Sequence, residues 1–149
     1  MAQRDRAPTL VVADTSVIVK WFRQKEVLAK SAFALREAYL IGIIALAEPS
    51  LVVYELANVL RYKDDLTTPQ VQAAVQSLYD MGWKWVAPSS AVMQRAVEIG
   101  RLYETTVYDA VFASLAESLE AKYITADERL ARRLGALPFV YFMTDPMAL

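Results

Sequence analysis

The 149-residue sequence contains no cysteine and no histidine, and it has only four glycines. Without cysteine there is no disulfide framework, thiol nucleophile or thiolate metal site, and this composition fits a reducing compartment. Without histidine there is no Ser-His-Asp triad, no histidine-based ribonuclease chemistry and almost no route to a zinc site. Chemistry based on oxygen atoms is what remains.

The few glycines have a predictable use. Gly42, Gly82 and Gly135 stand where predicted helices should end, a position that glycine favours. Because only one glycine is left over, the sequence has no glycine-rich loop to hold phosphates. This counts against a P-loop protein and against a dinucleotide-binding fold.

Long hydrophobic runs are also missing. The run Ala38 to Ala47 is bounded by Glu37 and Glu48 and is half of the roughly 20 residues that a membrane helix needs. The N-terminal apolar run stops at Asp14, too soon for a signal peptide. We therefore expect a cytoplasmic protein with no membrane contact. The 56% hydrophobic content is more than a core requires, which hints at a partner surface.

The numbers of basic and acidic residues are nearly equal, but the two kinds are unevenly distributed along the chain. The net charge is -1, yet residues 1–36 hold seven Lys and Arg against three Asp and Glu, whereas residues 37–120 hold five against eleven. The net charge argues against bulk coating of nucleic acid. It leaves room for a nuclease with a few backbone contacts, for which Lys20, Arg23 and Lys25 are candidates. Solvated surface charge is the ordinary role of such residues.

Short β-branched runs alternate with helical periods along the chain. The predicted strands are Thr9–Ala13, Ile43–Ala47, Trp83–Ala87, Lys122–Thr125 and Phe139–Phe142, and Thr68 with Pro69 marks a helix start. This alternation predicts an α/β fold of three layers, with a central, mostly parallel sheet of about five strands and helices on both faces. The length predicts a single domain over residues 1–149.

Four acidic residues stand where an apolar run ends or an apolar helix begins: Asp14, Glu55, Asp109 and Asp127. Asp14 and Asp127 follow predicted strands, and ligands of parallel sheets bind outside the carboxyl ends of the strands. An acid against apolar surface is costly unless it is paired or binds a cation. No comparable set of Lys or Arg lies beside these four. The pattern therefore predicts a site for Mg²⁺ or Mn²⁺.

Helix capping is the competing explanation for three of these acids. Asp14 can be the N-cap of the helix that follows it, and Asp127 lies in a first helical turn. Thr106 with Asp109, and Thr125 with Glu128, fit capping boxes. Glu55 has no capping role, because it lies on the flank of the helical stripe that contains Val52, Leu56, Val59 and Leu60.

The chain resembles the PIN-domain ribonucleases, in particular the VapC-type toxins of prokaryotic toxin-antitoxin pairs, from about Leu10 to Phe142. The segments that carry the resemblance are DTSVIVKWF (Asp14–Phe22), PSLVVYELANVL (Pro49–Leu60), YDAVFASLA (Tyr108–Ala116) and TADERL (Thr125–Leu130). All four acidic positions of the family pattern are filled. Residues Met1 to Pro8 precede the usual start of the family and form an N-terminal extension with no assigned role.

The resemblance implies that Asp14, Glu55, Asp109 and Asp127 are catalytic metal ligands. Ser16, Asn58 and Thr125 would support them or contact substrate, unless they are caps. It implies hydrolysis of RNA with Mg²⁺ or Mn²⁺, giving 5′-phosphate and 3′-hydroxyl ends. It also implies a homodimer and an antitoxin that covers an apolar groove and extends a basic side chain toward the acids.

Three other functions remain open. A phosphohydrolase with an aspartyl nucleophile usually needs a second Asp two residues after the first, where this chain has Ser16. A receiver-like phospho-acceptor domain needs paired acids after the first strand, but Thr15 follows Asp14. A PIN-like fold that has lost catalysis and serves only as a binding module is the stronger competitor, although the four acids are intact.

Overall fold

The computed structural model describes residues 6–149, so residues 1–5 of the predicted N-terminal extension lie outside the described part. The described chain contains one sheet of five strands in the order β3-β2-β1-β4-β5, and every neighbouring pair is parallel. The strands are β1 (Thr9–Ala13), β2 (Ile44–Glu48), β3 (Lys84–Trp85), β4 (Lys122–Thr125) and β5 (Val140–Phe142).

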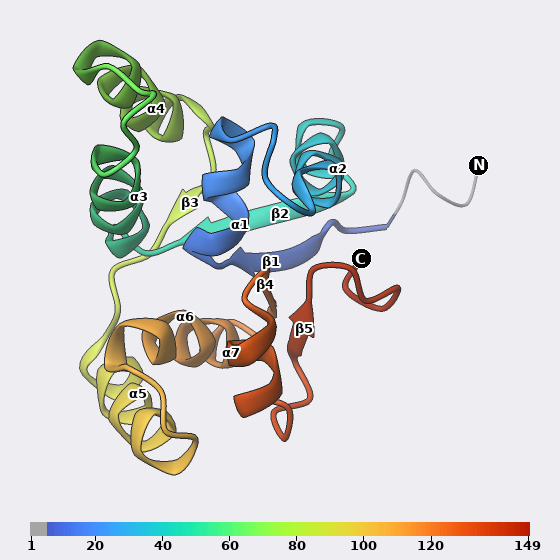
Figure 1. The fold of residues 1–149 in the computed structure, drawn as a ribbon. Coiled ribbons are helices and arrows are strands. Elements are labelled where there is room, and N and C mark those ends of the chain that lie inside the picture. Colours follow the sequence, from blue (N-terminus) through green and yellow to red (C-terminus); the bar gives the residue numbers. More distant parts are fainter. Residues whose placement is uncertain (1–5) are drawn as a thin grey trace.

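Helices cover both faces of this sheet, as Figure 1 shows. On one face lie α1 (Thr15–Val19), which continues into the 3₁₀ helix η1 (Lys20–Phe22), then α2 (Ala29–Leu40), α3 (Leu51–Arg61) and α4 (Thr68–Asp80). On the other face lie α5 (Ser90–Leu102), α6 (Val107–Ser118) and α7 (Glu128–Arg133). The predicted three-layer α/β architecture is confirmed.

The predicted element bounds differ from the observed ones mainly at the edge of the sheet. β1 and β4 have the predicted bounds, whereas β3 is reduced from five predicted residues to Lys84–Trp85. β3 pairs only with the end of β2. Because β2 stops at Glu48, before a proline, few of its residues are available to pair with β3. Helix α4 begins at Thr68, one residue before the predicted first helical position Pro69, and its N-cap is Thr67, which forms a capping box with Gln70.

Two of the three glycines predicted to end helices do so in a conformation that other residues avoid. Gly42, after α2, has φ of +83°, and Gly82, after α4, has φ of +74°. Both values lie in the left-handed region, where a side chain would be strained. Gly135 follows the end of α7 without a positive φ.

The core lies on both sides of the central strands. Helix α6 is buried continuously from Ala110 to Ala116, and its Phe112 ring stacks on Tyr123 of β4 at 6.4 Å between ring centroids. Burial of each such large side chain contributes about 1.5–3 kcal/mol. Within residues 6–149, none of the helices has both the length and the hydropathy required to cross a bilayer.

The strand order places a crevice between β1 and β4. The chain leaves β1 toward β2 and β3 on one side, but β4 leads to β5 on the other side. Right-handed crossovers therefore put the two sets of helices on opposite faces. Ligands of such sheets bind at this switch point, outside the carboxyl ends of the strands.

Candidate functional site

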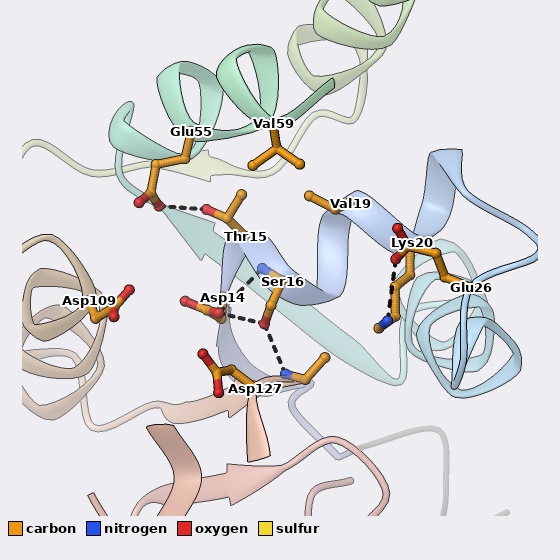
Figure 2. A pocket seen from close by; sticks show the side chains of 11 residues that line it. Asp14, Thr15, Ser16, Val19, Lys20, Glu26, Glu55, Val59, Asp109 and Asp127 are labelled. Carbon is orange, nitrogen blue, oxygen red and sulfur yellow. Dashed lines mark hydrogen bonds and ion pairs between the residues drawn. The ribbon is translucent and has the colours of Figure 1, made fainter. Parts of the chain in front are cut away.

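A cavity of about 340 Å³ lies at this switch point. All four predicted acids line it, and Figure 2 shows their side chains facing a common space. Asp14 and Glu55 come from the β1–α1 and α3 side of the sheet, whereas Asp109 and Asp127 come from α6 and the β4–α7 junction. The other lining residues are Thr15, Ser16, Val19, Lys20, Glu26, Val59 and Ala126.

Asp14 is the most enclosed of the four acids, with 5% of its surface exposed. It is the N-cap of α1, and its Oδ2 accepts a hydrogen bond from the Ser16 backbone N–H at 3.2 Å. Its Oδ1 accepts from the Tyr123 hydroxyl at 2.7 Å, and Oδ2 also accepts from the Thr125 hydroxyl at 3.2 Å. The predicted capping role is therefore confirmed, and the same side chain faces the cavity.

Ser16 and Thr125 join the ends of β1 and β4 beneath the acids. The Ser16 hydroxyl donates to Asp14 and accepts from the Ala126 backbone N–H at 3.0 Å. The Thr125 hydroxyl accepts from the Asp127 N–H at 3.0 Å. Thr125 does not cap α7, so the predicted capping box with Glu128 is wrong. Asp127 itself is the N-cap and accepts from the Leu130 N–H at 3.1 Å.

Glu55 lies in the middle of α3 and points toward α1. Its Oε1 accepts a hydrogen bond from the Thr15 hydroxyl at 2.7 Å, which Figure 2 shows as a dashed line. Burial raises the pKa of Glu55 to about 7, and the nearby charges of Asp14 and Asp109 add to this rise, while the Thr15 hydrogen bond opposes it. Glu55 is thus an acid that can hold or release a proton near neutral pH.

Asp109 lies in the first turn of α6, whose N-cap is Thr106. The Asp109 N–H donates to the Thr106 hydroxyl at 3.1 Å, but the Asp109 side chain turns to the Thr105 hydroxyl at 3.4 Å instead of closing the predicted capping box. Burial raises the pKa of Asp109, and the neighbouring charge of Asp14 raises it further. The Asp109 carboxylate therefore leaves the capping box open and lines the cavity.

The donor set fits a hard divalent cation. Carboxylate and hydroxyl oxygens are the ligands that Mg²⁺ and Mn²⁺ prefer, and mutual repulsion among the acids favours a compensating positive charge. Lys20, which also lines the cavity, pairs with Glu26 at 3.4 Å and does not neutralise the four acids. Across residues 6–149, no three acidic side chains lie close enough together to form a preassembled ligand set. The four carboxylates line one cavity without forming such a set.

The burial of Glu55, together with this repulsion, gives a pH-dependent stability that can be measured without any metal. Since the pKa of Glu55 is raised in the folded state, its contribution to stability is fully present below its ordinary value of 4.5 and is lost as the pH rises through about 7. In EDTA, we expect the melting temperature of the wild type to fall across this interval. The variant Glu55→Gln should show a smaller fall. Identical pH profiles for the two proteins would contradict the assignment of Glu55.

Three of the predicted residues, Asn58, Lys25 and Arg23, are not part of the cavity lining. Asn58 is exposed on α3, and the neighbouring Val59 lines the cavity in its place. Lys25 is exposed and is not part of the cavity lining either. Arg23 binds Asp65 through a guanidinium nitrogen at 2.8 and 2.9 Å from the two carboxylate oxygens.

Sequence reasoning missed two buried groups next to the site. Tyr123 is fully buried and donates to Asp14. Glu48 is fully buried at the end of β2, where its Oε1 accepts from the Ala13 N–H at 2.7 Å and its Oε2 has no partner. Burial raises the pKa of Glu48 well above its ordinary value. In the sequence, Glu48 looks like the charged boundary of an apolar run, so no pattern distinguished it from a surface acid.

Several solved structures of similar fold are those of toxins or of toxin-antitoxin complexes. One is a toxin-antitoxin complex from Klebsiella pneumoniae, with a TM-score of 0.69 and 16% identity over 91% of this chain and 98% of that chain. VapBC2 from Rickettsia felis, bound to a promoter DNA fragment, has a TM-score of 0.66 and 15% identity over 90% of this chain and 97% of that chain. VapC20 from Mycobacterium tuberculosis, a sarcin-ricin loop cleaving toxin, has a TM-score of 0.63 and 12% identity over 82% of this chain and 94% of that chain.

At the level of sequence, no curated protein matches the chain. The family profile described as PIN domain matches residues 11–135, which include all four acids of the cavity. The match covers most of the chain and agrees with the parallel sheet and its helices. The chain therefore belongs to the PIN domain family.

Proposed function

We propose that the protein, as a single domain over residues 1–149, is an endoribonuclease that requires Mg²⁺ or Mn²⁺ and acts as the toxin of a toxin-antitoxin pair. The observation that carries the proposal is the cavity at the switch point, onto which Asp14, Glu55, Asp109 and Asp127 all face. Membership of the PIN domain family supports nuclease activity, and the toxins among the proteins of similar fold support the biological role.

The four carboxylates would hold the cation, which when bound supplies positive charge to the scissile phosphate and makes water a better nucleophile. Ser16, Thr125 and Tyr123 fix the Asp14 carboxylate by hydrogen bonds. Thr15 fixes Glu55 in the same way. The side chains are thus oriented before substrate arrives.

The chemical step would be hydrolysis of a phosphodiester. A water oxygen bonds to phosphorus, the bond from phosphorus to the 3′ oxygen breaks, and that oxygen takes a proton, giving 5′-phosphate and 3′-hydroxyl ends. Without a cation, burial raises the pKa of Glu55 to about 7. A cation held by this carboxylate would favour its charged form, so Glu55 would act as a ligand.

Apolar surface outside the active site supports the proposed antitoxin and homodimer. A groove of about 700 Å³ is lined by residues of α3, α5 and α6, and its lining residues Tyr54 and Tyr108 are 72% and 65% exposed. A second hollow lies between α3 and α4, lined by Ala57, Leu66 and Val71 among others. Exposed apolar patches of this kind mark contacts between proteins. Sedimentation analysis of the purified chain tests the dimer directly.

The decisive experiment incubates purified protein, free of any antitoxin, with single-stranded RNA in Mg²⁺, Mn²⁺ or EDTA. We expect cleavage that requires the ion and leaves 5′-phosphate ends. Equal cleavage in EDTA would overturn the metal-dependent mechanism. RNA binding with no cleavage under either metal would instead favour a PIN-like binding module that lacks catalysis.

The role of Tyr123 can be tested by removing its hydroxyl group. The variant Tyr123→Phe keeps the ring stacked on Phe112 but loses the hydrogen bond to Asp14. Loss of a group that orients a metal ligand typically weakens metal binding by about 10- to 100-fold. We expect the Mg²⁺ midpoint of cleavage to rise by that factor in Tyr123→Phe.

The matched control is Tyr39→Phe, which removes a tyrosine hydroxyl that donates to the Met81 carbonyl at 2.8 Å, outside the cavity lining. Its Mg²⁺ midpoint should stay at the wild-type value. Equal midpoints in the two variants would show that Tyr123 contributes to packing alone.

A further inference from the structure

The cavity has a second end whose chemistry differs from that of the carboxylates. Figure 2 shows Lys20 and Glu26 at this end, with Val19 between them and the four acids. Lys20 belongs to η1, and Glu26 follows it in the segment that leads to α2. A ligand that fills the cavity thus meets acids at one end and an amine at the other.

Three cations gather around Glu26. The Lys20 amine lies 3.4 Å from one oxygen of Glu26, while Arg23 Nε and the Lys63 amine each lie 4.0 Å from the other. We call Lys20, Arg23 and Lys63 the basic cluster. Two of its three contacts with Glu26 are longer than a hydrogen bond, so Glu26 satisfies few of the donors that these side chains carry.

The basic cluster has more positive than negative charge. Its three cations face two carboxylates, those of Glu26 and Asp65. The other ion-pair group found in residues 6–149 has more negative than positive charge, because its single cation, Arg95, binds both Glu98 and Glu117. Lys20 is also well enclosed, with 14% of its side chain exposed, so salt screens its charge less than that of a surface lysine.

We infer that the basic cluster is a binding subsite for a backbone phosphate of the RNA strand, next to the phosphate that the carboxylates cleave, with Glu26 occupying the place of that anion when RNA is absent. The inference rests on the proposed function. Phosphate contacts set the position of a nucleic acid on a protein without reading its sequence. A contact at one end of the cavity therefore places the next phosphodiester over the acids at the other end.

The subsite also offsets an electrostatic obstacle. A phosphate approaching four carboxylates is repelled by them, and the repulsion is strongest before a cation is bound. Cations at the cavity margin attract the strand and hold it in one register. Among the described residues, Lys20 is the single cationic residue that lines the cavity, which makes it the member of the basic cluster with the largest expected effect.

The test measures binding of a labelled single-stranded RNA of mixed sequence by fluorescence anisotropy in EDTA, where cleavage does not interfere, at several salt concentrations. Loss of one phosphate contact should lower the salt slope by about 0.7 and weaken binding about fivefold at 0.1 M salt. We expect Lys20→Met to show both changes. Glu26→Gln should do the reverse and bind more tightly, since the competing anion is gone.

Lys30→Met is the matched control, because Lys30 is an exposed lysine on α2 outside the cavity lining. Its binding should equal that of the wild type. If Lys20→Met behaves like Lys30→Met, or if Glu26→Gln weakens binding as a merely structural residue would, the subsite is refuted. Binding of a polyglutamate peptide through the same residues, with RNA binding unaffected by them, would also refute it and point to an acidic protein partner.

Cleavage assays separate this inference from the nuclease proposal. With Mg²⁺, Lys20→Met should raise KM by the factor seen in binding and leave kcat close to wild type, since the contact is not at the reacting phosphate. RNA binding that depends on the basic cluster, without any cleavage, would sustain the subsite and overturn the nuclease. If the wild type cleaves RNA and Lys20→Met has an unchanged KM, the nuclease proposal stands and the subsite is overturned.

Discussion

The variant Asp14→Asn should fold normally and yet lose RNA cleavage. Asparagine caps helices about as well as aspartate, and its oxygen can still accept from the Ser16 N–H while its amide donates to the Tyr123 hydroxyl oxygen. What it lacks is the negative charge that a cation requires. Because the loss of groups that merely support metal ligands costs about 10- to 100-fold, we expect the loss of Asp14 to exceed about a hundredfold in cleavage rate.

The sequence offers a closely matched control in Asp145. Its side chain accepts from the backbone N–H two residues further on, that of Met147, at 2.9 Å, as Asp14 accepts from Ser16. Asp145 is exposed and is not part of the cavity lining, so Asp145→Asn should retain full cleavage. An Asp14→Asn protein that still cuts RNA in Mg²⁺ would show that Asp14 is a helix cap alone.

Mg²⁺ should raise the melting temperature of the wild type by several degrees. A ligand at about one hundred times its dissociation constant stabilises the folded state by roughly 2.7 kcal/mol. For a chain of this size, each kcal/mol corresponds to about 2–4 °C. Burial, and after it the neighbouring acidic charges, raise the pKa values of Glu55 and Asp109, and the charge of a bound cation, which offsets both effects, is the physical source of this gain.

Scanning calorimetry at constant ionic strength, with NaCl replacing MgCl₂, isolates the specific effect. Asp14→Asn should melt in EDTA at or above the wild-type temperature, because one repelling charge is gone, and it should lose the response to Mg²⁺. A wild-type melting temperature that does not change with Mg²⁺ up to millimolar concentrations would argue strongly against the metal site.

The architecture could be predicted from sequence because parallel strands bury both faces and read as short apolar runs. β1 and β4 have the predicted bounds for this reason. β3 does not, because its length depends on where its neighbour β2 stops, a tertiary property that the local pattern of Trp83 to Ala87 does not contain.

The acids of the site could be predicted because each is fixed to a rigid element of recognisable pattern. Tyr123 could not, since an aromatic residue in a buried strand reads as core, and only the fold reveals that its hydroxyl reaches Asp14. The pairing of Thr15 with Glu55, 40 residues apart, is equally invisible in sequence. Asn58, predicted to support the acids or contact substrate, is exposed on α3 outside the cavity lining, because the face that α3 turns to solvent is set by its packing.

The carboxylates come from two helical layers on opposite faces of one sheet, and this division has a consequence for local unfolding. A ligand held by Asp14 and Glu55 on one side and by Asp109 and Asp127 on the other is lost whenever either layer opens. Its binding therefore raises the free energy of both openings equally. When the ligand binds, amide hydrogens of α3 and of α6 should therefore both exchange more slowly with solvent, and by the same factor.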